Sequence, residues 1–289
     1  MKYIEYLSFR FATELMRLCP FFMLYAFSDI ISYVLRSIVR YRKVVIYNNL
    51  KNSFPDKTEE EIKNLSKSFY KHLADITLES LKGMTVSEKS INKRYTVKNT
   101  EISDGYFDND QNVLCLTGHY GNWEYGILGT NNSLRHQAVA LYLPLSNKYS
   151  EKYGLKRRKR FGMKMVAVQE TKSIFEKPLD KPVAIIMAAD QSPSNREKAI
   201  WTKFLNQETA CLHGPEAYAK KVNLPVLYLS IKKPKRGYYQ LVIEKLIESP
   251  QDLKPNEITN IYMNRLEKDI LEKPEYYLWS HRRWKHKKT

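Results

Sequence analysis

Short apolar runs of strand length recur through the second half of the chain, and helical patterns separate most of them. The runs cover residues 113–116, 138–143, 163–168, 183–187, 226–231 and 238–243. The helical patterns cover residues 122–130, 147–160, 170–177 and 210–222. Strands that alternate with helices favour a sheet whose strands are mostly parallel. The last two runs have only residues 232–237 between them, which indicates a hairpin at the sheet edge. The sequence therefore predicts an α/β fold with a mostly parallel central sheet flanked by helices.

The first 40 residues are apolar and aromatic, but charges interrupt them at Arg17, Asp29 and Arg36. The longest uncharged run among them, residues 18–28, is shorter than the about 20 apolar residues that a spanning helix needs. We interpret residues 1–40 as a membrane-anchoring helical segment that lies in one leaflet, as an interfacial or re-entrant anchor. A buried helix pair of a soluble protein is the alternative. Because no repeat or low-complexity linker divides the rest, residues 41–289 are predicted to form one domain.

A long helix is predicted from Thr58 to Gly83. Thr58 is suited to the N-cap and Glu61 stands at the capping-box position. Apolar residues then recur at helical spacing until Gly83 ends the pattern. A basic amphipathic helix is predicted before it, over residues 41–54, and a further helix over residues 258–271.

The charge balance indicates an acidic partner. The chain has 48 Lys and Arg against 31 Asp and Glu, a net charge of +17. Such an excess favours nucleic acid, an anionic membrane surface or an acidic protein as partner. A hydrophobic content of 43% excludes wholesale disorder. Cys19, Cys115 and Cys211 are scattered without a C-x-x-C pair, which is typical of reduced core residues rather than of metal ligands or disulfides.

His119 is the first candidate for chemistry. It lies in a Gly-flanked turn directly after the apolar run 113–116, and ligands of α/β proteins collect at the carboxyl ends of strands. Imidazole is the side chain best suited to accept a proton near neutral pH. Glu124 follows five residues later, so on one continuous helix the two side chains would point about 140° apart. They converge only if His119 lies in the turn and Glu124 in the first helical turn, as a base and its orienting carboxylate would. A turn histidine that merely caps the helix is the alternative.

Asp190 is the second candidate, because it follows the apolar run 183–187. It should emerge beside His119 if their two strands are neighbours; an Asp that caps its own loop is the alternative. Arg157, Arg158 and Arg160 stand near the end of a predicted helix, and guanidinium groups bind phosphate and carboxylate bidentately. A solvated basic helix end would have the same composition.

The common nucleophile, nucleotide-binding and zinc motifs are absent from the sequence, and the C-terminal segment is open to two interpretations. The chain has no G-x-S-x-G elbow, no P-loop, no G-x-G-x-x-G and no His/Cys cluster for zinc. Without a candidate nucleophile, His119 would act directly as a base on a substrate hydroxyl. Residues 276–288 mix aromatic and cationic side chains. That composition suits single-stranded nucleic acid and a membrane interface equally well.

The ordered set of motifs resembles the late acyltransferases of lipid A biosynthesis, the lauroyl/myristoyl transferase branch of the lysophospholipid acyltransferase superfamily. The resemblance extends over nearly the whole chain. It rests on N-L…F-P at 49–55, T-G-H-x-G-N-W-E at 117–124, Leu143-Pro144 with Asn147, R-x-R-x-G at 158–162, D-Q at 190–191 and L-W-x-H-R-R-W-K at 278–285. The chain departs from the family at 204–206, where many members have F-F-G, and at 212–213, where a Thr is common.

The resemblance implies a membrane-associated O-acyltransferase at the cytoplasmic face of the inner membrane. It would move a fatty acyl group from an acyl-carrier-protein thioester to a hydroxyl of a lipid A precursor, without a covalent acyl-enzyme, a cofactor or a metal. Another glycolipid or a glycerophospholipid as acceptor is the alternative, and a basic nucleic-acid-binding protein is a remote one.

The resemblance also implies roles for the site residues. His119 would be the base and Glu124 would orient it, while Arg158 and Asp190 would organise the acceptor or the developing charge. Substrate binding would further involve Gly121 and Asn122, with main-chain N–H groups near Gly121 as the oxyanion site. The acidic carrier protein, the phosphorylated glycolipid and the anionic membrane surface would each complement the positive charge of the protein.

Overall fold

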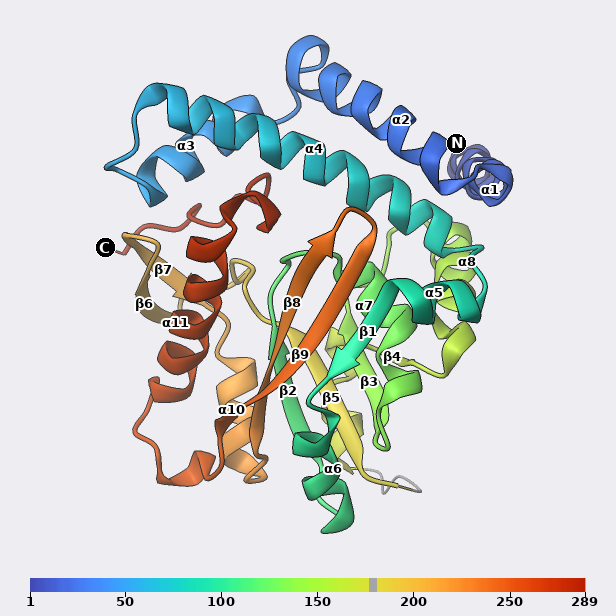
Figure 1. Cartoon of the computed structure of the whole chain (residues 1–289). Coiled ribbons are helices and arrows are strands. Elements are labelled where there is room, and N and C mark those ends of the chain that lie inside the picture. The colour runs from blue at the N-terminus through green and yellow to red at the C-terminus, as the bar shows by residue number, and fades with distance from the viewer. Residues whose placement is uncertain (177–180, 289) are drawn as a thin grey trace.

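A computed structural model describes residues 1–176 and 181–288 of the chain. Its centre is a seven-stranded sheet in the order β1-β9-β8-β2-β5-β3-β4 (Figure 1). The strands are β1 (Tyr95–Lys98), β2 (Val113–Thr117), β3 (Gln137–Tyr142), β4 (Lys164–Ala167), β5 (Val183–Ala188), β8 (Val226–Lys235) and β9 (Tyr238–Ile247). The five strands from β8 to β4 run parallel to one another, whereas β9 and β1 run the opposite way. The predicted mostly parallel α/β sheet is confirmed.

Two features of the strands differ from the prediction. The hairpin of β8 and β9 exists, but β1 pairs outside β9 and forms the edge. This four-residue strand escaped prediction because a strand so short leaves little periodicity to detect. A separate antiparallel pair, β6 (Ile200–Phe204) and β7 (Gln207–Cys211), also escaped it. The predicted helix 210–222 therefore begins later, as α10 (Gly214–Lys221).

Helices cover both faces of the sheet and cross its upper end in Figure 1. They are α3 (Lys43–Ser53), α4 (Glu59–Gly83), α5 (Glu88–Arg94), α6 (Thr100–Asp108), α7 (Trp123–Gly129), α8 (Lys148–Arg158), α9 (Lys172–Glu176), α10 and α11 (Glu257–Glu272). The predicted helix 170–177 reaches one residue beyond the described part. The capping box of α4 is confirmed: Thr58 Oγ1 accepts from the Glu61 amide at 3.3 Å, and Glu61 Oε2 accepts from the Thr58 amide at 2.8 Å.

The N-terminal segment forms α1 (Lys2–Leu18), α2 (Phe21–Tyr33) and a π-helical turn (Val34–Ile38). Among the described residues, one stretch, Phe21–Ile38, is long and apolar enough to cross a membrane by length and composition. It exceeds the predicted run because the helix continues through Asp29 and Arg36. In Figure 1, α2 lies along α4, on the side of α4 that faces away from the sheet. The outward side of α2 exposes large apolar side chains, among them Phe22, Phe27 and Ile30.

The C-terminal residues 276–288 fold back into the body of the protein. Trp279 is fully buried, and its ring contacts those of Phe54 and Trp284. The Asn49 amide donates to the carbonyl oxygens of Trp279 and His281 at 2.8 and 2.9 Å. The motif segments 49–55 and 278–285 thus meet in space. The tail therefore packs against the domain through Trp279 and the buried Arg283, while its lysines stay exposed.

Replacing Trp279 tests this arrangement. Trp279→Ala should lower the free energy of unfolding by about 3–5 kcal/mol, because it removes a fully buried ring and leaves a cavity. Leu271→Ala on α11 is the control, since that side chain is 54% exposed and should change the value little. Denaturant unfolding measures both. Equal stabilities of the two variants would show that the tail is not packed in the core.

Candidate active site

His119 and Asp190 meet because β2 and β5 are parallel neighbours. The register pairs Thr117 with Ala188, and the Ala189 amide donates to the Thr117 carbonyl at 3.1 Å. His119 and Asp190 each follow two residues after the paired residues, so both leave the sheet at its carboxyl edge. The His119 Nδ1 atom lies 2.7 Å from Asp190 Oδ1. The expectation that Asp190 emerges beside His119 is confirmed.

The surroundings of His119 distinguish its two ring nitrogens. The Asp190 side chain is only 2% exposed and accepts at Nδ1, so the ring proton belongs on that nitrogen. The Nε2 atom then carries the lone pair, and the Gln191 side-chain amide donates to it at 3.2 Å. The His119 side chain is 19% exposed, with the Trp123 ring edge-on at 5.1 Å between centroids. Nε2 is therefore the basic nitrogen of this site.

Burial and charge act in opposite directions on this pair. Burial alone would lower the pKa of His119, but the carboxylate of Asp190 and the more distant one of Glu124 outweigh it and raise the pKa above 6.5. Burial would likewise raise the pKa of Asp190, yet His119 and the Arg283 guanidinium lower it below its usual value. Asp190 is thus held ionised, and it stabilises the protonated imidazole.

Glu124 does not make the direct contact with His119 that the sequence suggested. Its carboxylate accepts two hydrogen bonds from Arg158, Nη2 to Oε1 at 2.7 Å and Nε to Oε2 at 3.1 Å. Glu124 lies in the first turn of α7 and Arg158 in the last turn of α8. Because strand pairing already places Asp190 on Nδ1, Glu124 affects His119 only through its charge.

The two neighbouring arginines, Arg157 and Arg160, bind other parts of the fold and not Glu124. Arg157 Nη2 bonds Glu14 of α1 at 3.3 Å. Arg160 donates to the carbonyl oxygens of Gly83 and Val86 at 2.7 and 3.0 Å. Of the three arginines in this segment, Arg158 is the one that the structure brings to Glu124.

Gly121 and Asn122 build the turn rather than line an open surface. Gly121 has a φ of +64°, and a Cβ there would collide with the Ile231 side chain. Its N–H donates to the Tyr276 carbonyl at 3.0 Å, so this amide is engaged within the fold. Asn122 is almost fully buried, and its Oδ1 accepts from the Tyr125 amide at 2.9 Å as the N-cap of α7.

Three residues near the pair stand in the quoted motifs but were given no role from the sequence: Gln191, His281 and Arg283. Arg283 is buried and donates to the Ala210 carbonyl at 2.6 Å and to Cys211 Sγ at 3.2 Å. Burial lowers the pKa of His281 to about 4, so it is neutral and accepts from the Ser192 amide at 3.2 Å. Arg283 and His281 belong to the mixed tail, whose composition did not indicate which cations point inward.

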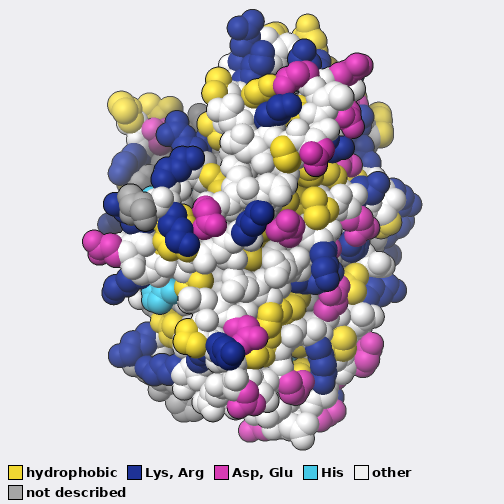
Figure 2. Space-filling view, turned by 90° about the vertical axis from the view of Figure 1, so that its left-hand side faces the viewer, with side chains coloured by type: hydrophobic (Ala, Val, Ile, Leu, Met, Phe, Trp, Pro, Cys, Tyr) yellow, Lys and Arg dark blue, Asp and Glu magenta, His cyan; other side chains and the backbone are white. Residues whose placement is uncertain are grey.

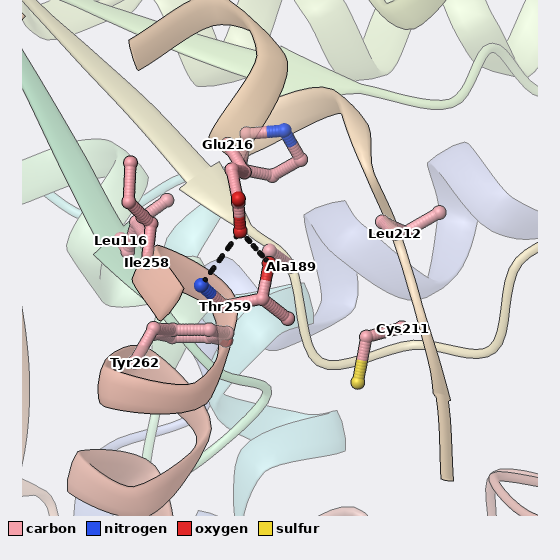
Figure 3. Close-up of a pocket in the computed structure, with 9 residues that line it drawn as sticks. Leu116, Ala189, Cys211, Leu212, Glu216, Ile258, Thr259 and Tyr262 are labelled. Carbon is pink, nitrogen blue, oxygen red and sulfur yellow. Dashed lines mark hydrogen bonds between the residues drawn. The ribbon is translucent and has the colours of Figure 1, made fainter. Parts of the chain in front are cut away.

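A small cavity adjoins the carboxyl ends of β2 and β5 (Figure 3). It is lined by Leu116, Ala189, Cys211, Leu212, Pro215, Glu216, Ile258, Thr259 and Tyr262. The Glu216 carboxylate there accepts from the amide and hydroxyl of Thr259 at 3.0 and 2.8 Å, which satisfies the start of α11. With a volume of about 10 Å³, the cavity has room for about one water molecule. In this conformation it does not accommodate a fatty acyl chain.

A histidine held by a buried carboxylate at the strand ends of an α/β sheet can take the proton of an attacking hydroxyl. Residues 2–286 match the family described as bacterial lipid A biosynthesis acyltransferase. The chain belongs to this family and is an O-acyltransferase of lipid A biosynthesis.

Two similar proteins carry matching names. A lipid A biosynthesis palmitoleoyltransferase of Escherichia coli (strain K12) is 24% identical over 253 residues, which cover 86% of this chain and 81% of that protein. A lipid A biosynthesis acyltransferase of Shigella flexneri has the same identity and the same coverage.

Neutralising Asp190 should lower the pKa of His119. In Asp190→Asn the attraction of the carboxylate for the imidazolium is gone, whereas burial still disfavours the charged ring. NMR titration of the imidazole carbon-bound protons measures the pKa. Asp252→Asn at an exposed loop is the matched control and should leave it unchanged. An unchanged pKa in Asp190→Asn would contradict the electrostatic pairing.

Proposed function

We propose that this acyltransferase moves a fatty acyl group from an acyl-carrier-protein thioester to a hydroxyl of a lipid A precursor, as a secondary acylation. Membership of the family and the name of the Escherichia coli relative support lipid A chemistry. The observation that carries the mechanism is the His119–Asp190 contact of 2.7 Å, which leaves Nε2 as a partly exposed base.

In the proposed reaction the acceptor hydroxyl replaces the Gln191 amide at His119 Nε2. His119 takes the hydroxyl proton as the oxygen attacks the thioester carbonyl. The new C–O bond forms, the C–S bond breaks, and His119 returns the proton to the departing thiolate. Asp190 stabilises the imidazolium between these steps, which is the role of the carboxylate in a catalytic triad without the protein nucleophile. General base catalysis of this kind contributes roughly 10²- to 10⁴-fold.

Glu124 and Arg158 act as a pair in this proposal. The bidentate contact fixes the guanidinium plane of Arg158 beside the site. From there Arg158 would organise a phosphate of the acceptor or the charge that develops on the carbonyl oxygen. Glu124 would hold Arg158 in place and add its negative charge to that of Asp190 in stabilising protonated His119.

We propose that the enzyme works at the cytoplasmic face of the inner membrane, with α1 and α2 as an interfacial anchor. Both helices expose large apolar side chains, including Phe11, Leu18, Phe22 and Phe27. The net charge of +17 complements an anionic leaflet, at about 1 kcal/mol for each Lys or Arg near the surface. Figure 2 shows Lys and Arg side chains over much of one face of the molecule, with Asp and Glu side chains among them.

The base assignment is tested by His119→Ala. The variant should stay folded, but its transfer from acyl carrier protein to lipid A precursor should fall by roughly 10²-fold or more. His213→Ala, at an exposed histidine, should keep full activity. A His119→Ala variant with wild-type turnover would refute the assignment.

The same two variants test the acceptor in cells. Mass spectrometry of lipid A from cells that lack the gene should show the loss of one secondary acyl chain. His213→Ala should restore the chain and His119→Ala should not. Lipid A that is unchanged by loss of the gene would overturn the proposed acceptor and favour another glycolipid or a glycerophospholipid.

The anchor is tested by placing aspartates on the outward face of α2. The double substitution Phe22→Asp and Phe27→Asp should reduce binding to vesicles of anionic phospholipid, because both exposed rings would become charged. The control Leu271→Asp adds a negative charge at an exposed apolar position on α11, outside the proposed anchor. It should bind the vesicles nearly as well as the wild-type protein. Sedimentation with vesicles measures the bound fraction. Equal binding of all three proteins would contradict the α2 anchor.

A further inference from the structure

Helix α4 carries a buried polar stripe that faces the site turn. His72, Asp75 and Glu79 stand at positions i, i+3 and i+7, which share one side of a helix. All three side chains are at most 3% exposed. A buried carboxylate is costly unless hydrogen bonds satisfy its oxygens. The partners of this stripe therefore indicate what α4 must hold in place.

Glu79 joins three separate parts of the chain. Its Oε2 atom accepts from Asn122 Nδ2 at 2.6 Å and from the Tyr239 hydroxyl at 2.7 Å. Its Oε1 atom accepts from the Tyr25 hydroxyl at 2.8 Å. Asn122 is the N-cap of α7 and lies three residues after His119, while Tyr25 lies on α2. One carboxylate thus connects the N-terminal helix to the turn that carries His119.

A second contact of α4 holds the same turn. His72 Nε2 lies 3.2 Å from the carbonyl oxygen of Gly121, the residue with positive φ. Burial lowers the pKa of His72 well below 6.5, so the ring is neutral and donates one proton there. Two consecutive residues of the turn, Gly121 and Asn122, are therefore held by α4.

Asp75, on the same side of α4 as His72 and Glu79, holds α2 to that helix. It accepts from Ser28 Oγ at 2.7 Å and from Arg236 Nη2 at 2.6 Å. Arg236 lies at the tip of the β8–β9 hairpin and also bonds Asp29 at 2.7 Å. The neighbouring Gly237 packs against the Tyr25 hydroxyl so closely that any Cβ there would collide with it. The inward side of α2 thus combines these polar contacts with the buried Leu24, while its outward side exposes large apolar side chains.

We propose that Glu79 is a positioning residue through which the seating of α2 on α4 sets the geometry of the His119 turn. Because α2 is the proposed anchor, this links membrane association to the competence of the active site. The inference rests on the proposed function. Among the described residues, the hydrogen bonds that lead from the Tyr25 hydroxyl to the turn run through Glu79. The Tyr25 carbonyl also reaches α4 through Arg236 and Asp75, which removal of the hydroxyl leaves in place.

Removal of the Tyr25 hydroxyl is the direct test. In Tyr25→Phe, kcat for acyl transfer should fall about tenfold with KM nearly unchanged. A tenfold loss is about what one hydrogen bond to a charged group contributes. The pKa of His119, followed by NMR, should fall as the ring loses its alignment with Asp190. Tyr33→Phe, on the same helix but exposed, is the matched control and should behave as wild type.

A double-mutant cycle tests the route. Glu79→Gln should lower kcat by itself, and Tyr25→Phe should cost little more in that background, because both remove the same link. Ser28→Ala, which loosens the Asp75 contact and leaves Glu79 intact, provides a second probe of α2 seating if Glu79→Gln does not fold. Full additivity of Tyr25→Phe and Glu79→Gln would overturn the route.

The outcomes separate this inference from the proposed function. A Tyr25→Phe protein with normal kcat per folded molecule and a normal His119 pKa would reduce Glu79 to a structural role. Activity retained in His119→Ala would instead overturn the proposed function, and the NMR pKa of His119 would still report whether α2 and the turn are coupled.

Discussion

The parallel pairing of β2 with β5 is the constraint on which the site depends. Both strands are almost entirely buried, and the register of Thr117 against Ala188 brings the chain out of the sheet at one place. His119 and Asp190, 71 residues apart, therefore meet at 2.7 Å without any local sequence that links them. A slip of this register would separate the two side chains and leave the buried Asp190 carboxylate without its hydrogen bond from His119.

The turn after β2 is held in place by residues from other parts of the chain. A left-handed glycine gives it a sharp bend, and groups from distant segments satisfy its backbone. The C-terminal segment supplies the Leu278 amide to the His119 carbonyl and the Tyr276 carbonyl to the Gly121 amide. Helix α4 supplies His72 and Glu79. Since these bonds stabilise backbone and cap groups that would otherwise be buried without partners, the site is a meeting point of three segments.

Asp190 and Glu124 both raise the pKa of His119, but from different distances and environments. Asp190 is buried and contacts the ring, so its charge acts at short range in a poorly solvated place. Glu124 is more exposed and is paired with Arg158, which moderates its effect on the imidazole. Glu124, five residues after His119, is thus a helix-start carboxylate that pairs with Arg158, while the strand-end Asp190 contacts the histidine ring.

The sequence by itself determined the elements that have strong local causes. Periodicity placed all six predicted strands, the capping box placed the start of α4, and the ends of buried runs placed His119 and Asp190 at strand termini. Apart from the β8–β9 hairpin, the order of the strands in the sheet and the carboxylate that each cation contacts could be read only from the folded protein. Both depend on contacts between residues that are distant in the sequence. The composition of the tail likewise did not indicate that Arg283 is buried. The sequence suggested Glu124 as the partner of His119, but the pairing of β2 with β5 places Asp190 Oδ1 2.7 Å from His119 Nδ1, and the Glu124 carboxylate pairs with Arg158 instead.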